Sequence, residues 1–136
     1  MIVDRKPARY NGRPDTVLAL VLDCADLARA VEFWCDALGY VRQGPSPDED
    51  SVYCQLIPAD GDGVELLLQK TTERKAAKNR MHVDLRHPDL EAETARLLKA
   101  GARHTTGDLV QEDGWAWYVL TDPDGNEFCV LRPPTP

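Results

Sequence analysis

The sequence has no excess of basic residues, no long apolar segment and no closely paired cysteines. Its 16 Lys and Arg are outnumbered by 23 Asp and Glu, which gives a formal net charge of −7. This charge argues against a nucleic-acid groove, which needs a basic surface. The negative charge can instead keep the protein soluble or attract a cationic small molecule. Because no apolar run approaches the ~20 residues that span a bilayer, we expect neither nucleic acid nor a membrane as a partner.

The N-terminal residues 1–6 contain no apolar stretch of the signal-peptide type, so we expect a cytoplasmic protein. No cysteine belongs to a Cys-x-x-Cys pair, and in a reducing cytosol the thiols should be free. Most buried cysteines act as small apolar side chains, and that is the default expectation here. The four cysteines are Cys24, Cys35, Cys54 and Cys129.

The first half of the chain predicts a strand, a helix and three further strands. Residues 17–22 form a short apolar run that is typical of a buried strand. Asp26 is a candidate helix N-cap, and Gly39 is placed to follow the helix C-terminus. Strands are then predicted over residues 40–43, 51–57 and 64–69, with turn residues at 60–63 between the last two.

The second half repeats the same order of elements. Residues 81–86 alternate apolar and polar side chains as a half-buried strand does, and the polar ones, His82, Asp84 and Arg86, share a face. A helix is predicted from Leu90 to the residue before Gly101. The further predicted strands are residues 102–106, 115–120 and 127–131.

Three pairs of matching residues support an internal repeat. Asp26-Leu27 matches Asp89-Leu90, and Gly39 matches Gly101 to within one residue; the turns at 60–63 and 122–125 also match. Equal order of elements together with matching caps and turns indicates duplication.

We therefore predict an α+β fold made of two βαβββ modules in one chain, with a cleft between curved mixed β-sheets. Module 1 covers about residues 16–70, a linker covers 71–80 and module 2 covers 81–132. Together they form a single domain, with a lead-in at 1–15 and a tail at 133–136.

Several segments resemble the vicinal oxygen chelate superfamily, which includes glyoxalase I, bleomycin-resistance proteins, extradiol dioxygenases and fosfomycin-resistance enzymes. The resemblance covers roughly residues 16–132 and is nearest to the bacterial glyoxalase-like domain branch. The segments that carry it are Leu18–Tyr40, with Phe33-Trp34 and Leu38-Gly39-Tyr40, then residues 78–85 and residues 122–130.

The resemblance implies a place for a metal, because the metal enzymes of this superfamily take ligands from the first and last strands of each module. The matching positions here are Ala19, Glu65 (or Leu67), His82 and Cys129. A catalytic divalent site needs about three protein ligands, and Ala19 offers none. We therefore predict no cofactor; if Zn, Ni, Mn or Fe binds, His82, Glu65 and Cys129 are the expected ligands.

His82 is the leading candidate for a catalytic residue, because a neutral imidazole can transfer protons at neutral pH. Glu65 and Glu127 each stand two residues after a turn glycine and are expected on the side of the sheet that carries His82. The alternatives are that His82 only makes structural hydrogen bonds and that both glutamates lie at the solvated rim.

A second set of residues is expected to contact a ligand. Trp115, Trp117 and Val119 share one strand face, which forms an aromatic wall if it lines the cleft and is ordinary core if the helix covers it. Cys129 is either a reactive thiol or an inert buried one. The predicted ligand-binding residues are Gln69, Asp84, Trp115, Trp117, Val119 and Cys129.

Three functions are compatible with these features. The preferred one is a glyoxalase/bleomycin-resistance-like protein that binds a small molecule without a metal. The alternative is a glyoxalase-type lyase or isomerase that uses His82 with Glu65 and Glu127. The third is a subunit that associates through its aromatic face. On the resemblance alone we expect a homodimer.

Overall fold

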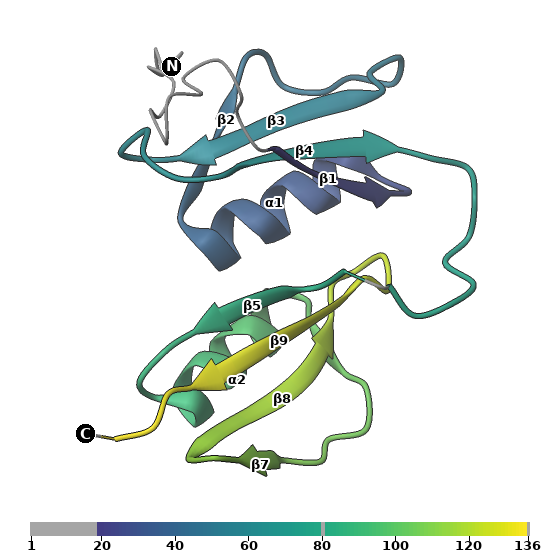
Figure 1. Cartoon of the computed structure of the whole chain (residues 1–136). Helices are drawn as coiled ribbons and strands as arrows, with labels where there is room; N and C mark the ends of the chain where they lie inside the picture. The colour runs from purple at the N-terminus through teal and green to yellow at the C-terminus, as the bar shows by residue number, and fades with distance from the viewer. Residues whose placement is uncertain (1–18, 80, 136) are drawn as a thin grey trace, which may run out of the picture. The chain divides into compact units, whose positions relative to one another are not determined.

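The structure is a computed structural model, and it describes residues 19–79 and 81–135. The chain divides into two compact units, Met1–Glu73 and Arg74–Pro136. Each unit contains one βαβββ module, so the predicted α+β class and the duplication are confirmed (Figure 1).

The first unit contains one helix and a four-stranded sheet. The strand order is β1-β4-β3-β2, with β1 and β4 parallel and the other neighbours antiparallel. Figure 1 shows α1 lying along one face of this sheet. The elements are β1 (Ala19–Cys24), α1 (Leu27–Leu38), β2 (Tyr40–Gln43), β3 (Tyr53–Pro58) and β4 (Glu65–Lys70).

Helix α1 begins and ends where its cap residues predict. The Asp26 carboxylate accepts a hydrogen bond from the backbone N–H of Arg29 at 3.1 Å, which satisfies one of the free donors of the first turn. Gly39 follows the helix with φ of 68°, a left-handed conformation that glycine adopts without steric cost. The buried face of the helix, which includes Phe33 and Trp34, forms the core with the sheet.

The second unit has the same plan with one additional strand. Its strand order is β5-β9-β8-β6, with β5 and β9 parallel, and β7 pairs with β8. Helix α2 lies along one face of this sheet (Figure 1). The elements are β5 (Val83–Arg86), α2 (Leu90–Ala100), β6 (Arg103–His104), β7 (Val110–Glu112), β8 (Trp115–Thr121) and β9 (Glu127–Arg132).

The caps of α2 repeat those of α1. Asp89 accepts from the backbone N–H of Ala92 at 3.1 Å, and the N–H of Gly101 donates to the carbonyls of Leu97 and Leu98. The buried residues of α2 are Leu90, Thr94 and Leu97. The core of this unit also includes Leu120, Phe128 and Val130 of the sheet.

Several strand boundaries differ by one or two residues from the sequence predictions, and one strand was not predicted. Strand β3 begins at Tyr53, two residues later than expected, because residues 48–51 close a hydrogen-bonded loop. Strand β7 is exposed at all three residues, so it has no alternation of apolar and polar side chains to predict it. Residues 17 and 18 of the first predicted strand, the lead-in 1–15, residue 80 of the linker and residue 136 lie outside the described residues.

Within residues 19–79 and 81–135, none of the helices combines the length and apolarity that a membrane crossing requires. The predicted domain bounds and the cleft between the two sheets stay predictions.

Candidate functional site

The pairing of the first and last strands fixes which side chains share a face in each unit. In the first unit, Ala19 lies opposite Glu65 and Val21 opposite Leu67. In the second unit, Asp84 lies opposite Cys129. Residues opposite each other in a sheet point to the same side, so Asp84 and Cys129 are neighbours on one face. The repeat therefore equates Val21 with Asp84 and Leu67 with Cys129.

We call the face of the second sheet opposite α2 its distal face. The other face of β8 is identified by Tyr118, whose hydroxyl donates to the Glu91 carboxylate of α2 at 2.9 Å. Because side chains alternate along a strand, those of Trp115, Trp117 and Val119 point away from α2, and the β8–β9 register places their partners on β9 on the same side. The residues of the distal face that the site uses are Asp84, Arg86, Trp115, Trp117, Val119, Glu127, Cys129 and Leu131.

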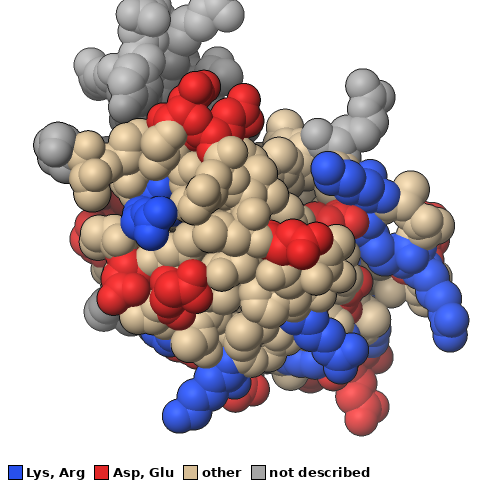
Figure 2. Space-filling view, turned by 90° about the horizontal axis from the view of Figure 1, so that it is seen from below, with Lys and Arg blue, Asp and Glu red and all other residues tan. Residues whose placement is uncertain are grey.

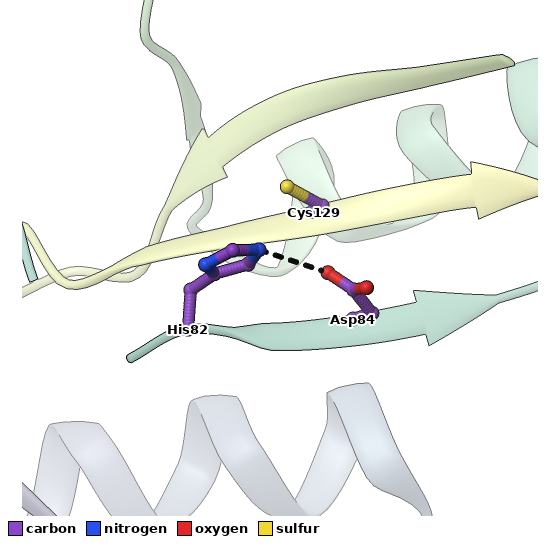
Figure 3. Close-up of side chains that lie close together, drawn as sticks. All are labelled: His82, Asp84 and Cys129. Carbon is purple, nitrogen blue, oxygen red and sulfur yellow. Dashed lines mark ion pairs between the residues drawn. The ribbon is translucent and has the colours of Figure 1, made fainter. Parts of the chain in front are cut away.

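Three potential ligand groups gather at one end of the distal face (Figure 3). His82 and Asp84 project from the β5 segment, and Cys129 lies on the neighbouring strand β9. The His82 Nε2 atom is 3.4 Å from Asp84 Oδ1, and the donor atoms of all three residues lie within 4.8 Å of one another. The side chains of His82 and Asp84 are 44% and 40% exposed, so the pair contributes little to stability.

Cys129 is held as a neutral thiol by its surroundings. Burial, followed by the charge of Asp84 and a hydrogen bond to Asp84, raises the pKa of this thiol to about 11. A thiol with such a pKa is a weak nucleophile, because only the thiolate reacts. The sequence alternative of an inert buried cysteine is therefore the one that these surroundings favour.

The same three residues are a partial fit to a zinc-type ion. Imidazole, carboxylate and thiol are all zinc ligands, and tetrahedral coordination brings ligand atoms to about 3.5 Å from one another, so only small side-chain adjustments are needed. The ion would have to displace the proton of Cys129 and would need a further ligand from solvent or substrate. Of the residues predicted to hold a metal, His82 and Cys129 belong to this group together with Asp84, and the role of Glu65, which lies in the first unit, stays a prediction.

The corresponding face of the first unit offers no such group. Ala19, Val21 and Leu67 occupy the positions that match His82, Asp84 and Cys129. Glu65 lies beside Ala19, and its carboxylate accepts a hydrogen bond from the Gln55 side chain.

Gln69 lies on the same face of the first unit, near the end of β4, and donates a 3.4 Å hydrogen bond to the Tyr53 hydroxyl. The first unit thus keeps the backbone plan of the second but not its chemistry.

Glu127 is engaged by the segment that precedes β5. Its Oε1 atom is 2.9 Å from Lys75 Nζ, and its Oε2 atom accepts from the backbone N–H of Asn79 at 3.1 Å. The Asn79 side chain also donates to the Asn126 amide oxygen. Burial raises the pKa of the Glu127 carboxyl, but the hydrogen bonds from Asn79 and Lys75 outweigh burial and leave the pKa below its ordinary value of 4.5.

The tryptophans of β8 lie on the distal face together with this group. Trp117 pairs with Leu131, which lies two residues beyond Cys129 on β9, and Val119 pairs with Cys129 itself. The predicted aromatic wall and the predicted polar residues of the second module therefore share one face.

Arg86, which was not among the predicted site residues, also belongs to this face, and its guanidinium carbon lies 5.1 Å from the centre of the Trp115 ring. Its shared parity with His82 and Asp84 was the sequence signal for it.

The model of the glyoxalase-like domain family matches residues 19–131. The chain belongs to this family. The match covers both modules and agrees with the vicinal oxygen chelate resemblance that the sequence motifs indicated.

Solved structures share the fold of this glyoxalase-like domain at low sequence identity. A glyoxalase/bleomycin resistance protein/dioxygenase family enzyme from Burkholderia phytofirmans PsJN is 12% identical, with a TM-score of 0.66 over 84% of this chain and 95% of that one. A member of the same superfamily from Sphaerobacter thermophilus DSM 20745 is 17% identical, with a TM-score of 0.61 over 86% and 98%. TioX from Micromonospora sp. ML1 is 19% identical, with a TM-score of 0.58 over 86% and 98%. No curated protein matches the chain.

The surface of the glyoxalase-like domain carries charges of both signs. On the face that Figure 2 shows, acidic and basic side chains are scattered among uncharged ones. Recognition on such a surface depends on individual side chains and their partners more than on a field of one sign.

The contacts of Glu127 predict a pH-dependent loss of stability. We expect Glu127→Gln to lower the free energy of unfolding by about 1–2 kcal/mol near pH 7, because it removes the carboxylate from two charge-assisted hydrogen bonds. Since the pKa is lowered in the folded chain, this contribution is fully present above the unfolded pKa and is lost as pH falls through the folded pKa. Urea unfolding at about pH 7 and about pH 3 should show a deficit that shrinks at the lower pH.

Glu112→Gln is the matched control, because it changes an exposed glutamate of β7. A deficit for Glu127→Gln that is equal at both pH values, or no larger than that of Glu112→Gln, would contradict the assigned role.

The surroundings of Cys129 predict slow alkylation. With a pKa of about 11 instead of 9.0, this thiol carries about a hundredfold less thiolate near neutral pH than an ordinary one. Asp84→Asn removes a nearby negative charge and should lower the pKa, so iodoacetamide should label Cys129 faster. Labelling is measured at each cysteine by peptide mass spectrometry, with Cys35 as the internal reference and Asp108→Asn as the control variant. An unchanged ratio of Cys129 to Cys35 labelling in Asp84→Asn would contradict the proposed coupling.

Proposed function

We propose that this protein binds a small, flat organic molecule on the distal face of the second sheet and needs no resident metal to do so. The observation that supports the proposal is the common face of Trp115 and Trp117 with the His82–Asp84 pair and Cys129. Ligand sites in proteins combine apolar and aromatic walls with a few placed polar groups, and this face has both.

Each part of the face has a distinct role in this proposal. Trp117 and Leu131 supply apolar contact area, and aromatic side chains do so at a low cost in conformational entropy. His82 and Asp84 supply a donor and an acceptor at one end, where a polar group of the ligand would be fixed. The apolar residues Ala19, Val21 and Leu67, at the positions of the first unit that match His82, Asp84 and Cys129, favour binding over metal-centred chemistry, because they offer no ligand atoms.

Binding of the neutral probe 1-naphthamide tests the proposal. We expect saturable stabilisation of the full chain in a thermal-shift titration, since a ligand that binds only the folded chain raises its melting temperature. Trp117→Ala should weaken binding about tenfold or more, because it removes an aromatic wall of the site. His82→Ala should weaken binding by less, because one hydrogen bond is lost.

Leu98→Ala, at an exposed position of α2, serves as the control and should bind like the unchanged chain. Calorimetry checks that the affinities follow the thermal shifts. Stabilisation that survives both Trp117→Ala and His82→Ala would place the ligand elsewhere and reject the proposed site.

A second candidate function is supported by the cluster of His82, Asp84 and Cys129. In this proposal the protein is a glyoxalase-type lyase or isomerase, and these residues hold a divalent ion that would polarise a substrate oxygen. Asp84 would then be the carboxylate that orients His82, whereas the sequence hypothesis paired His82 with Glu65 and Glu127. The contacts of Glu127 to Lys75 and Asn79 favour Asp84 for this role.

Titration with Co²⁺ distinguishes the two functions, since cobalt takes up zinc sites and reports a bound thiolate by its absorption. The metal-binding function predicts a thiolate-to-cobalt band that is lost in Cys129→Ala and retained in Cys54→Ala. The preferred function predicts that 1-naphthamide binding is unchanged by a chelator. Elemental analysis of protein purified without chelator gives the occupancy directly.

A further inference from the structure

Arg86 occupies the end of the distal face away from His82. In the β5–β9–β8 register, Arg86 lies opposite Leu131, and Leu131 lies opposite Trp117, so these three side chains form one row across the sheet. The arginine side chain leans from this row over Trp115, with 5.1 Å between its guanidinium carbon and the ring centre. An arginine over an indole is held by cation–π attraction and loses less freedom when it binds a partner.

The guanidinium has no carboxylate partner among the described residues 19–79 and 81–135. The ion pairs there include those of Lys75 with Glu127, His82 with Asp84 and Arg96 with Glu93. Asp84 is the carboxylate two residues before Arg86 on the same face, and it pairs with His82 instead. A guanidinium in contact with a ring face still presents its N–H edge, which matches the two oxygens of a carboxylate.

We propose that Arg86 is an anion-recognition residue and that the ligand of the distal face carries a carboxylate or a similar planar anionic group next to its aromatic part. This inference rests on the proposed function, because it places the anion beside the aromatic wall of Trp115 and Trp117. The face then has an order: Arg86 receives the anion, Trp117 and Leu131 in the same row receive the ring, and the His82–Asp84 pair at the other end receives a polar group.

One carboxylate acts against this assignment. Glu112 on β7 lies opposite Trp115 and is exposed. Its repulsion of an anion is screened by water, whereas hydrogen bonds from Arg86 act at contact and are charge-assisted. The contact interaction therefore decides the preference, and the net charge of −7 reduces the overall attraction of anions without removing it.

A matched pair of probes tests the inference. 1-Naphthoate and 1-naphthamide have the same ring system and differ in charge. We expect the full chain to bind naphthoate about tenfold more tightly, which is the lower end of what a hydrogen bond to a charged group contributes. Arg86→Gln should abolish this preference, because it lowers naphthoate affinity more than naphthamide affinity. Arg86→Lys should keep part of the preference, because it retains the charge but loses the planar fork.

Lys99→Gln is the charge control, since it removes one positive charge from the last turn of α2, which lies on the other face of the same sheet. Affinities are measured by calorimetry, and melting curves confirm that each variant is folded. A naphthoate preference that survives Arg86→Gln, or is lost equally in Lys99→Gln, would overturn the role of Arg86 while leaving the proposed function intact. If neither probe binds, or if both bind equally well to Trp117→Ala, the proposed function itself fails and the inference falls with it.

Discussion

The parallel pairing of the first and last strands is the constraint on which the site depends. Side chains alternate along a strand, so a shift of one residue in this pairing would move every group of β5 or β9 to the opposite face. The register that sets Asp84 beside Cys129 also sets Arg86 beside Leu131. The backbone hydrogen bond from His87 to the Leu131 carbonyl continues this register beyond the strand. The apolar residues Phe128 and Val130, buried on the α2 side, hold it in place.

The same constraint lets the two units diverge without a change of fold. Each helix is capped by an aspartate and ends at a glycine, and each buries its apolar residues against one face of its own sheet. The other face contributes less to these cores, so it tolerates substitution. In the first unit this face has Ala19, Val21 and Leu67; the second unit has His82, Asp84 and Cys129 at the same register. Membership of the glyoxalase-like domain family therefore describes the backbone and the core, whereas the proposed function depends on the face away from the helix.

Much of the fold could be predicted from local rules, because caps, turns and alternation are written in short segments. Asp26 and Asp89, and the glycines after the helices, locate both helices to within a residue. Parity places Trp115, Trp117 and Val119 on one face of their strand, but only the β8–β9 register of the structure adds Cys129 to that face. Parity does not say which of several charged groups on a face will pair, since that depends on segments distant in the sequence. Glu127 is the clearest case: Lys75 and Asn79, about fifty residues upstream, determine its surroundings.

This division of partners explains why Arg86 remains available for a ligand. Two acidic groups near His82 already have partners: Glu127 pairs with Lys75, and Asp84 lies beside His82 and the Cys129 thiol. An arginine further along the same strand then has an aromatic ring as its nearest partner in place of a carboxylate. Contact with a ring leaves the hydrogen-bonding edge of a guanidinium unsatisfied except by water, whereas a salt bridge would occupy it. The exposed strand β5 thus presents its positive group beside apolar surface, and an anionic group joined to an aromatic ring is the chemistry that satisfies both at once.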